Sequence, residues 1–156
     1  MKDAVCITYP NKLSIKVDPE DVALATQYKY GRHPDGYARR STYVDGKAGS
    51  GYLHRDIMRA KPGEHVDHIN GDVTDNRRRN LRLCTNSQNM HNRGAQRNNT
   101  TGFKGVHFYK SRNCYTASIA VGGKLIRLGY HPTAEAAYSA YCAAGRKHHG
   151  EFFNPG

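Results

Sequence analysis

The sequence lacks the features that mark a secreted or membrane protein. No apolar run among its 156 residues is long enough to cross a bilayer. The N-terminus, MKDAVCITYP, does not have the basic segment followed by an apolar one that a secretory signal needs. The four cysteines are scattered without a C-x-x-C pair, which argues against a disulfide framework or a cysteine-rich zinc site. We expect an intracellular protein whose cysteines are small buried apolar residues.

Apolar residues and acidic residues are also scarce. Hydrophobic residues make up 37% of the chain, which favours two compact modules over one large core. Lys and Arg number 24 against 13 Asp and Glu, giving a formal charge of +11 that calls for a polyanionic partner, first of all nucleic acid. Between Asn76 and Lys104 there are six Arg and one Lys but no acidic residue.

The first half of the chain reads as short strands and turns. The segments LSIKV, QYKY and GYARRSTYV predict strands, separated by HPDG, VDG and the glycines at 46, 49 and 51. Between Tyr52 and Ala60, apolar residues at Leu53, Ile57 and Met58 have helical spacing. This helix would present His54 just ahead of the most informative segment.

The last third of the chain predicts a sheet followed by a helix. The segments FKGVHFY, YTASIAV and KLIRLG are strand candidates, and Gly122-Gly123 is a hairpin-turn signal between the last two. Thr133 can cap a helix that ends before Gly150 and carries alanines and Tyr141 at helical spacing. A three-stranded antiparallel sheet packed on one helix is expected.

The chemistry is concentrated between Val66 and Arg93. Asp67 and His68 stand at the end of a predicted strand, a turn-rich loop follows, and a second strand covers residues 80–84. Thr85 or Asn86 can cap a helix carrying Asn89 and Arg93 one turn apart. Because neighbouring strand residues point to opposite faces, Asp67 and His68 would need a twisted strand end to share one site.

These residue types suit phosphodiester hydrolysis. The Asp67 carboxylate and the Asn89 carbonyl oxygen are hard ligands of the kind that Mg²⁺ prefers, with Mn²⁺ as the alternative. A neutral His68 imidazole can act as the general base if an acceptor such as Asn80 holds its other nitrogen. A zinc site built from His65, His68, Cys84 and His91 is the competing interpretation, although the spacing matches no common zinc pattern.

The ordered set D-H, N-G, D-N-R, N-L-R and Q-N resembles the HNH endonuclease family, particularly the phage and intron-encoded homing enzymes. The lead-in segments VDPEDVALATQYKY, GYARR and LHRDIM are similar to the N-terminal parts of those proteins. The resemblance implies a ββα-metal fold in which Asp67 and Asn89 bind the metal, His68 is the general base and Asn80 orients His68. Many relatives have His at the last position, and Asn89 in its place disfavours softer ions.

The resemblance leaves more than one role open for some of the surrounding polar residues. His54 either contacts the scissile phosphate or supports the site, and a packing or surface role is equally compatible with the pattern. Arg82 either binds phosphate or lies along the strand surface. Phosphate contacts are the expected role of the remaining arginines, namely Arg77, Arg78, Arg79 and Arg93.

From Asn99 to Asn154 the chain resembles the Apetala or ethylene-response-factor DNA-binding domain, in phrases such as TGFKGV, LGYHPTAEAA and GEF. The resemblance implies a sheet that enters the DNA major groove, and Lys104 matches a basic position of that family. Strand alternation by itself predicts two faces. The helix-facing set is Val106, Phe108, Tyr115, Ala117, Ile119, Ile126 and Leu128. The open, DNA-contacting set is His107, Tyr109, Thr116, Ser118 and Arg127.

Together these features predict an α+β protein: an HNH nuclease domain with a strand-rich lead-in at 1–93, a linker at 94–102 and a DNA-binding domain at 103–156. The predicted function is that of a sequence-recognising homing-type endonuclease that binds double-stranded DNA and uses one metal ion to nick one strand. No obligate protein partner and no membrane are implied, and a phage-encoded protein would act in the bacterial cytoplasm. The competitors are a DNA-binding regulator with a non-catalytic HNH scaffold and an RNA-binding protein.

Overall fold

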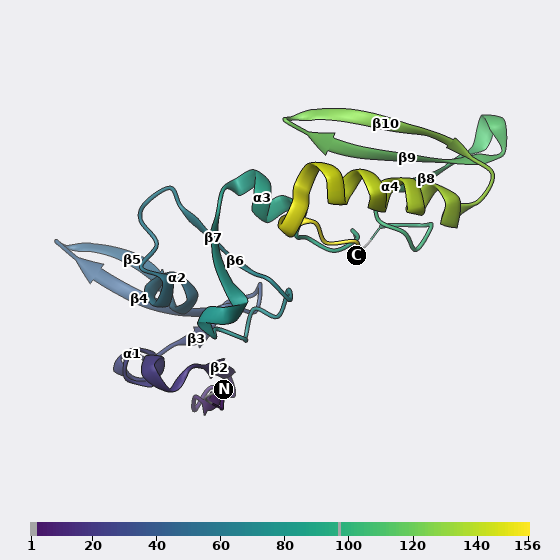
Figure 1. Ribbon diagram of the computed structural model, residues 1–156. Helices are drawn as coiled ribbons and strands as arrows, with labels where there is room; N and C mark the ends of the chain where they lie inside the picture. Colours follow the sequence, from purple (N-terminus) through teal and green to yellow (C-terminus); the bar gives the residue numbers. More distant parts are fainter. Residues whose placement is uncertain (1–2, 97) are drawn as a thin grey trace. The chain divides into compact units, whose positions relative to one another are not determined.

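A computed structural model describes residues 3–96 and 98–156 and divides the chain into two compact units, Met1–Asn89 and Met90–Gly156. The division falls ahead of the boundary expected at residue 93, and residue 97 of the expected linker lies outside the described residues. None of the helices in the described ranges combines the length and the apolar character needed to cross a membrane. Helix α3 (Asn86–His91) carries the chain from the first unit into the second (Figure 1).

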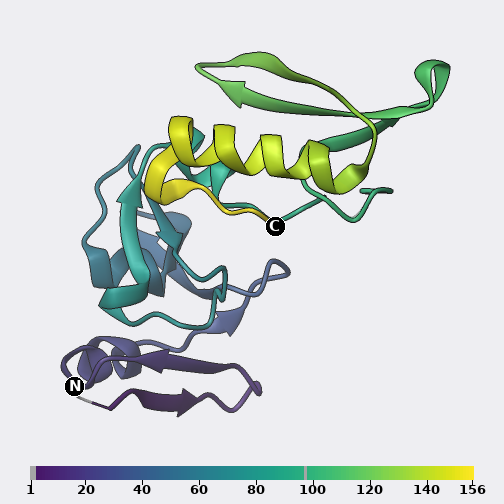
Figure 2. The ribbon, with the colours of Figure 1, turned by 45° about the vertical axis from the view of Figure 1, so that its right-hand side comes forward.

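The described part of the first unit consists of small antiparallel sheets and short helices (Figure 2). The sheets are β1–β2, β3–β4–β5 and β6–β7. The strands are β1 (Val5–Thr8), β2 (Ser14–Val17), β3 (Gly31–Arg32), β4 (Ala38–Val44), β5 (Lys47–Tyr52), β6 (His65–His68) and β7 (Leu81–Cys84). The α-helices other than α3 are α1 (Val22–Gln27) and α2 (Leu53–Met58), and the 3-10 turns are η1 (Pro19–Asp21) and η2 (Arg78–Asn80).

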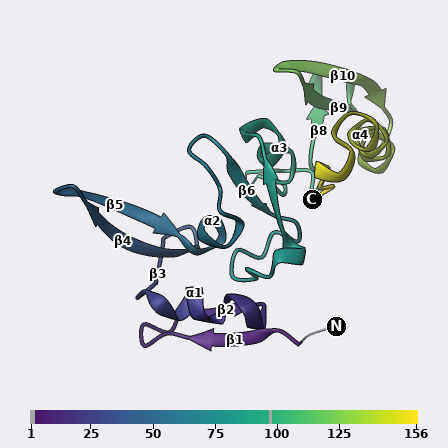
Figure 3. The ribbon, with the colours of Figure 1, turned by 60° about the vertical axis from the view of Figure 1, so that its left-hand side comes forward.

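Helix α2 lies beside β6 and anchors the core of the first unit (Figure 3). Leu53 and Ile57, one turn apart, are fully buried, and each such burial stabilises the fold by roughly 1.5–3 kcal/mol. The helix ends where Arg59 adopts a left-handed conformation with φ 51°. The same core contains residues from β2, α1, β4, β6 and β7, including Ile15, Ala25, Ala38, Val66 and Leu81. The predicted helix over 52–60 is thus confirmed, with His54 on it.

Two expectations for the lead-in are wrong. The segment QYKY is not a strand, because α1 occupies residues 22–27 and the chain then runs irregularly to β3. The helix-favouring run VALATQ follows a 3-10 turn that begins with Pro19, which suits a first helical position. Strand β5 was not expected because of its glycines, yet it pairs with β4 along its whole length, from Arg39 opposite Tyr52 to Val44 opposite Lys47.

The second unit is the expected antiparallel meander with one helix across one face of the sheet (Figure 1). Its elements are β8 (Val106–Tyr109), η3 (Lys110–Arg112), β9 (Cys114–Val121), β10 (Lys124–His131), α4 (Ala134–His149) and η4 (Gly150–Phe152). Gly122 and Gly123 join β9 to β10 with φ of 58° and 77°, as a tight hairpin turn requires. The Thr133 hydroxyl accepts a hydrogen bond from the Ala136 amide at 3.2 Å and caps α4, as predicted.

The core of this unit is smaller than the strand alternation predicted. Val106, Ala117 and Ile119 are buried under α4, and Tyr115 and Leu128 pack against them. Phe108 and Ile126, also expected in the core, are 43% and 40% exposed. The pairing shifts between Arg127 and Tyr130, so strict alternation along β10 does not hold through this irregular stretch. Of the cysteines, Cys142 alone is fully buried and Cys6 is exposed, so the expectation of buried thiols holds only in part.

Candidate nuclease site and nucleic-acid interface

The candidate catalytic residues lie on the β6–β7 hairpin of the first unit. In its register His68 pairs with Leu81 and Asp67 pairs with Arg82. Paired residues share a face of the sheet, so Asp67 and Arg82 lie on one face and His68 on the other. As expected for adjacent strand residues, Asp67 and His68 therefore point to opposite faces of the hairpin. His68 is the last residue of its strand.

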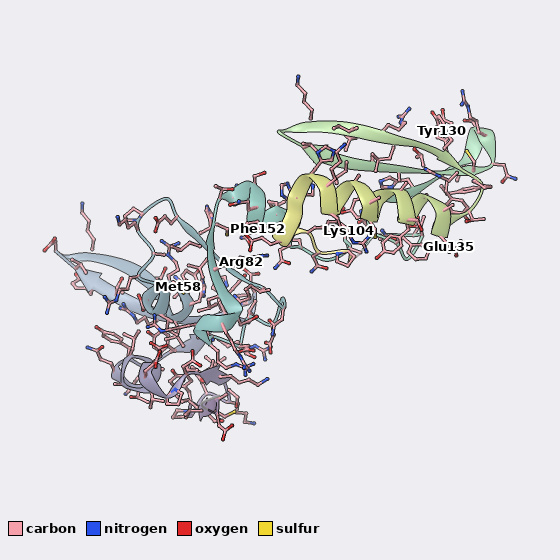
Figure 4. The ribbon with its side chains drawn as sticks, viewed as in Figure 1. Met58, Arg82, Lys104, Tyr130, Glu135 and Phe152 are labelled. Carbon is pink, nitrogen blue, oxygen red and sulfur yellow. The ribbon has the colours of Figure 1, made fainter. Side chains whose placement is uncertain are left out.

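Asp67 is held by an arginine across the hairpin. Arg82 donates to Asp67 Oδ2 from Nε at 2.8 Å and from Nη2 at 2.7 Å. Both side chains are largely buried, with 12% of the Arg82 side chain and 6% of the Asp67 side chain exposed. Figure 4 marks Arg82 on β7. The structure places Arg82 in a largely buried ion pair and not along an open strand surface, while its contact with phosphate stays untested.

His68 lies on the core side of the hairpin and is 3% exposed. Its Nε2 is 3.4 Å from Oδ1 of Asn76, a buried residue in the loop between the strands. Its ring lies 5.2 Å from that of His54 and 5.7 Å from that of Tyr37, between centroids. Burial lowers the pKa of His68, and the contact with Asn76 and the Asp67 charge oppose this in part. The environment favours the neutral imidazole that a general base requires.

His54 is also a neutral imidazole. It is buried on α2, and desolvation, followed by the nearby His68 and Arg55 charges, lowers its pKa to about 3. A side chain that remains uncharged at neutral pH is poorly suited to binding phosphate by charge. The structure therefore favours the supporting role for His54 over direct contact with the scissile phosphate.

Asn80 braces the loop between β6 and β7. Its Nδ2 donates to the Asp75 carbonyl at 2.8 Å and its Oδ1 accepts from the Asn70 amide at 3.0 Å. Its own carbonyl accepts from the Ile69 amide at 2.8 Å, directly after His68. The orientation of His68 by Asn80 stays a prediction. The side chain found on His68 Nε2 is that of Asn76, which the sequence did not single out.

Asn89 is half-buried on the short helix α3. The helix begins with a reciprocal cap: the Gln88 amide donates to the Thr85 hydroxyl at 3.2 Å, and the Thr85 amide donates to Gln88 Oε1 at 2.8 Å. The predicted cap at Thr85 is confirmed. The helix ends at His91, however, so the prediction that Arg93 shares a helical face with Asn89 is wrong.

The chemistry of the donor set fits a hard divalent cation. Asp67 offers a carboxylate and Asn89 a carboxamide oxygen, both from the β6–β7–α3 segment. A cation at Asp67 would share that carboxylate with Arg82. Among the residues that the structure describes, no three His, Cys, Asp or Glu side chains gather as metal ligands. The zinc set is not assembled there: His65 pairs with Cys84, whereas His68 points to the opposite face of the hairpin.

Two of the arginines expected to bind phosphate are engaged within the first unit. Arg77 donates from Nε to Asp75 Oδ1 at 2.6 Å, and this bond holds the pKa of the buried Asp75 carboxyl below its ordinary value. Arg78 donates to both carboxylate oxygens of Asp21, at 2.9 and 2.6 Å. These contacts give both arginines a structural role in bracing the loop. Arg79 is exposed on the same turn.

The open face of the second unit has the composition expected of a nucleic-acid interface. The register places His107 opposite Thr116 and Ser118 opposite Arg127. These four residues line a shallow hollow together with Leu125, whose side chain is 76% exposed. The predicted face assignment of the four is confirmed. Their contact with DNA stays a prediction.

A basic aromatic cluster at one end of this sheet was not foreseen. The Arg112 guanidinium lies 4.7 Å from the centre of the Tyr130 ring, and Arg127 Nη1 donates to the Tyr130 hydroxyl at 3.1 Å. The Tyr109 ring is 5.5 Å from that of Tyr130, which Figure 4 marks. A sequence signal existed in Arg112 within the turn K-S-R-N, but only the fold brings it to Tyr130.

Lys104, expected to contact DNA, is hydrogen-bonded within the second unit. Its ammonium donates to the carbonyls of His91 at 3.0 Å and Asn154 at 2.7 Å, and to that of Arg93. An ammonium has three protons, and the three carbonyls account for them. Lys104, marked in Figure 4, therefore links the beginning and the end of the second unit, and its contact with DNA stays a prediction.

In a comparison with known proteins, residues 51–91 match the model of the family described as HNH endonuclease. The segment contains α2, β6, β7 and α3. A curated relative, Protein 3.8 of Escherichia phage T7, is 32% identical over 62 residues, or 40% of this chain. The chain spans about half of that phage protein, 51%.

A solved structure of DNA binding and cleavage by the HNH homing endonuclease I-HmuI is also similar to this chain. It is 20% identical with a TM-score of 0.38, and the match covers 78% of this chain and 75% of that one. The family match ends at His91, ahead of the sheet of the second unit, so the DNA-binding assignment of that sheet stays a prediction.

Proposed function

We propose that the protein is a divalent-metal-dependent DNA endonuclease of the HNH type. The observation that carries the proposal is the match of residues 51–91 to the HNH endonuclease family, since this segment contains Asp67, His68, Asn80 and Asn89. The lowered pKa of His68, which keeps its imidazole neutral as a general base requires, supports the same proposal. A formal charge of +11 supports DNA as the substrate.

The general base is His68. In neutral form it accepts a proton from a water molecule whose oxygen attacks the phosphorus atom. A bond forms between that oxygen and phosphorus, the bond to the 3′ oxygen breaks, and the departing oxygen takes a proton from solvent. Asn80 acts through the loop that it braces, and its carbonyl and side chain fix the chain directly after His68.

Asp67 and Asn89 would hold the metal ion. Mg²⁺ is the expected ion, with Mn²⁺ as an alternative, because both donors are hard oxygen atoms. When bound, the ion supplies charge stabilisation at the phosphoryl oxygens and at the departing 3′ oxygen. Arg82 holds the Asp67 carboxylate in place through two hydrogen bonds to Oδ2.

The second unit docks on double-stranded DNA through the open face of its sheet. Residues 90–156 contain nine Lys and Arg against two acidic residues, Glu135 and Glu151. The face offers donors and acceptors for base edges and guanidinium groups for phosphates. Its contact residues are His107, Tyr109, Thr116, Ser118 and Arg127, joined by Arg112 and Tyr130 from the basic aromatic cluster. Arg79 and Arg93 remain candidates for backbone contacts.

The enzyme is of the homing type and nicks one strand. The homing assignment rests on the resemblance of the ordered set D-H, N-G, D-N-R, N-L-R and Q-N to the phage and intron-encoded homing enzymes. One set of Asp67, His68 and Asn89 per chain serves one phosphodiester bond, so a single protein molecule makes one cut per binding event.

A plasmid-nicking assay tests the proposal. Wild-type protein with Mg²⁺ should convert supercoiled plasmid carrying phage sequence to the open circular form. His68→Ala should slow this by about 10²–10⁴-fold, the usual contribution of a general base. The matched control is His148→Ala, which removes an exposed histidine at the end of α4 and should nick at the wild-type rate. Equal rates for His68→Ala and wild type would remove His68 from the mechanism.

One observation favours a second candidate, a DNA-binding regulator with a non-catalytic HNH scaffold. Arg82 already neutralises Asp67, and His68 is only 3% exposed. Such a protein would bind duplex DNA yet leave every fragment of a phage genome uncut with Mg²⁺ or Mn²⁺. Cleavage of any fragment that is lost on Asp67→Ala would exclude it.

A further inference from the structure

Three rings form a closed cluster at the proposed general base. The Tyr37 ring lies 5.0 Å from His54 and 5.7 Å from His68, and the two imidazoles are 5.2 Å apart. Each ring therefore contacts the other two, and the two imidazoles meet edge to face at 69°. Tyr52 extends the cluster, with its ring 5.6 Å from that of His54.

Three separate elements bring these rings together. His68 ends β6, His54 lies on α2, and Tyr37 stands directly before β4. Tyr37 is reached through a tight turn in which the Gly36 amide donates to the His33 carbonyl at 2.8 Å. Gly36 has φ 91°, and a Cβ at this position would lie 2.9 Å from Val73 in the β6–β7 loop. The turn thus packs against the loop of the catalytic segment, although Tyr37 lies outside the 51–91 match.

We propose that Tyr37 and His54 are positioning residues whose rings hold the imidazole of His68 in its reactive orientation, an inference that rests on the proposed endonuclease function. The hydrogen bond that His68 Nε2 makes to Asn76 Oδ1 is long at 3.4 Å, so it holds the ring plane only weakly. Aromatic contacts of this kind are directional, because rings prefer offset or edge-to-face arrangements. A general base must stay within hydrogen-bonding reach of its water, so small displacements are costly.

The proposal requires a ring, and not a charge, at both positions. His54 is neutral because burial lowers its pKa to about 3, so it offers its neighbour a ring surface. Tyr37 meets both imidazoles through its ring. Phenylalanine should therefore replace Tyr37, whereas an aliphatic residue should not.

The test compares Tyr37→Phe with Tyr37→Leu in the full-length protein. Tyr37→Leu should lower kcat for plasmid nicking by about tenfold to a hundredfold, the effect of a displaced catalytic group. The Kd for duplex DNA, measured by fluorescence anisotropy in EDTA, should not change. Tyr37→Phe should restore kcat. The control is Tyr43→Leu at the tip of the β4–β5 hairpin, where the tyrosine is 77% exposed and outside the cluster.

His54 gives a second, independent comparison. His54→Phe keeps a ring beside His68 and should retain most of kcat, whereas His54→Ala should lose it. Equal loss in both variants would assign a polar role to His54 and overturn its place in the proposal.

A spectroscopic readout separates this inference from the endonuclease proposal. In ¹H–¹³C spectra of the metal-free protein, the His68 ring signal should move in Tyr37→Leu and stay in Tyr37→Phe. Circular dichroism checks that the variants fold, and Tyr37→Met takes the place of Tyr37→Leu if the latter does not. Wild-type nicking together with an unchanged kcat in the aliphatic variant overturns the positioning role alone. A wild-type protein that nicks no DNA overturns the endonuclease assignment, and the positioning role with it.

Discussion

Among individual residues, Asp67 and Arg82 form a buried ion pair at the position where the proposed mechanism needs a metal ligand. The two side chains neutralise each other's charge on one face of the β6–β7 hairpin, and both are largely buried. Removing one partner of such a pair leaves a buried charge without compensation, which costs far more than the pair itself contributes.

Arg82→Ala should therefore lower the free energy of unfolding by about 3–5 kcal/mol in the absence of divalent ions. Mg²⁺ should recover part of this loss, because an ion that binds the exposed Asp67 carboxylate stabilises the folded state by mass action. Urea denaturation in EDTA and in Mg²⁺ measures both effects. If Mg²⁺ stabilises Arg82→Ala no more than Arg82→Ala/Asp67→Ala, Asp67 is not a metal ligand.

The buried imidazole of His54 makes stability depend on pH. Its pKa is about 3 in the folded protein and about 6.5 when unfolded, so the unfolded chain binds the extra proton between these values. Stability is therefore full above pH 6.5 and falls as the pH drops, with His54 contributing a loss of about 2 kcal/mol between pH 7 and pH 5.

Denaturation curves at pH 7 and pH 5 measure this loss, with His54→Phe as the comparison. The lowered pKa of His68 acts in the same direction, so the variant should retain part of the pH dependence. A wild-type protein as stable at pH 5 as at pH 7 would contradict the burial of both imidazoles.

At the level of secondary-structure elements, helix α4 needs a glycine at position 145, a need that residue type alone does not reveal. Gly145 lies within α4, where glycine is normally less favourable than alanine by about 1 kcal/mol. A Cβ at this position would meet the Phe153 ring at 2.1 Å. The glycine is needed because the chain after α4 folds back and lays Phe153 against the helix, 5.5 Å from the Tyr141 ring.

Gly145→Ala should therefore destabilise the protein by about 1–3 kcal/mol through overpacking. Without the Phe153 ring, the effect of the substitution on stability should reverse. In the Phe153→Ala background, Gly145→Ala should raise the free energy of unfolding by about 1 kcal/mol. A double-mutant cycle from thermal denaturation measures the coupling. Additive effects would show that Phe153 does not pack on Gly145.

Element boundaries were predictable where the chain marks them locally. Thr133 and Gly150 bracket α4, and the Gly122-Gly123 turn defines the hairpin of β9 and β10. Strand β5 was missed because its glycines carry no strand signal, and its pairing partner β4 decides its conformation. The end of α3 at His91 was missed because the nearest glycine, Gly94, indicates a helix end three residues later.

The whole molecule consists of two units, each with its own core, and a strongly positive charge. Affinity for duplex DNA should fall steeply with salt, because each phosphate contact releases condensed counterions. Arg127→Ala, on the open face, should reduce the slope of log Kd against log salt concentration by about 1.

Lys104→Met is the matched control for this measurement. Its ammonium is bound to three carbonyls, so its loss should leave the salt slope unchanged while lowering the thermal stability of the second unit. Anisotropy titrations over a range of salt concentrations provide the comparison. A Lys104→Met slope that falls as much as that of Arg127→Ala would return Lys104 to the DNA interface.

The local features of this protein could be predicted from its sequence: the basic charge, the β6–β7–α3 order around Asp67 and His68, and the sheet and helix of the second unit. These follow from patterns within a few residues of one another, namely strand alternation, helical spacing, caps and turns. The pairing of charges and the contacts between rings could be learned only from the folded chain. Cross-strand pairing and core packing bring these side chains to their partners: Arg82, Asn76, Arg112 and Tyr37. The periodicity of the sequence predicts on which face of a strand or helix a side chain lies. The residues that the side chain contacts depend on how elements distant in the chain pack together.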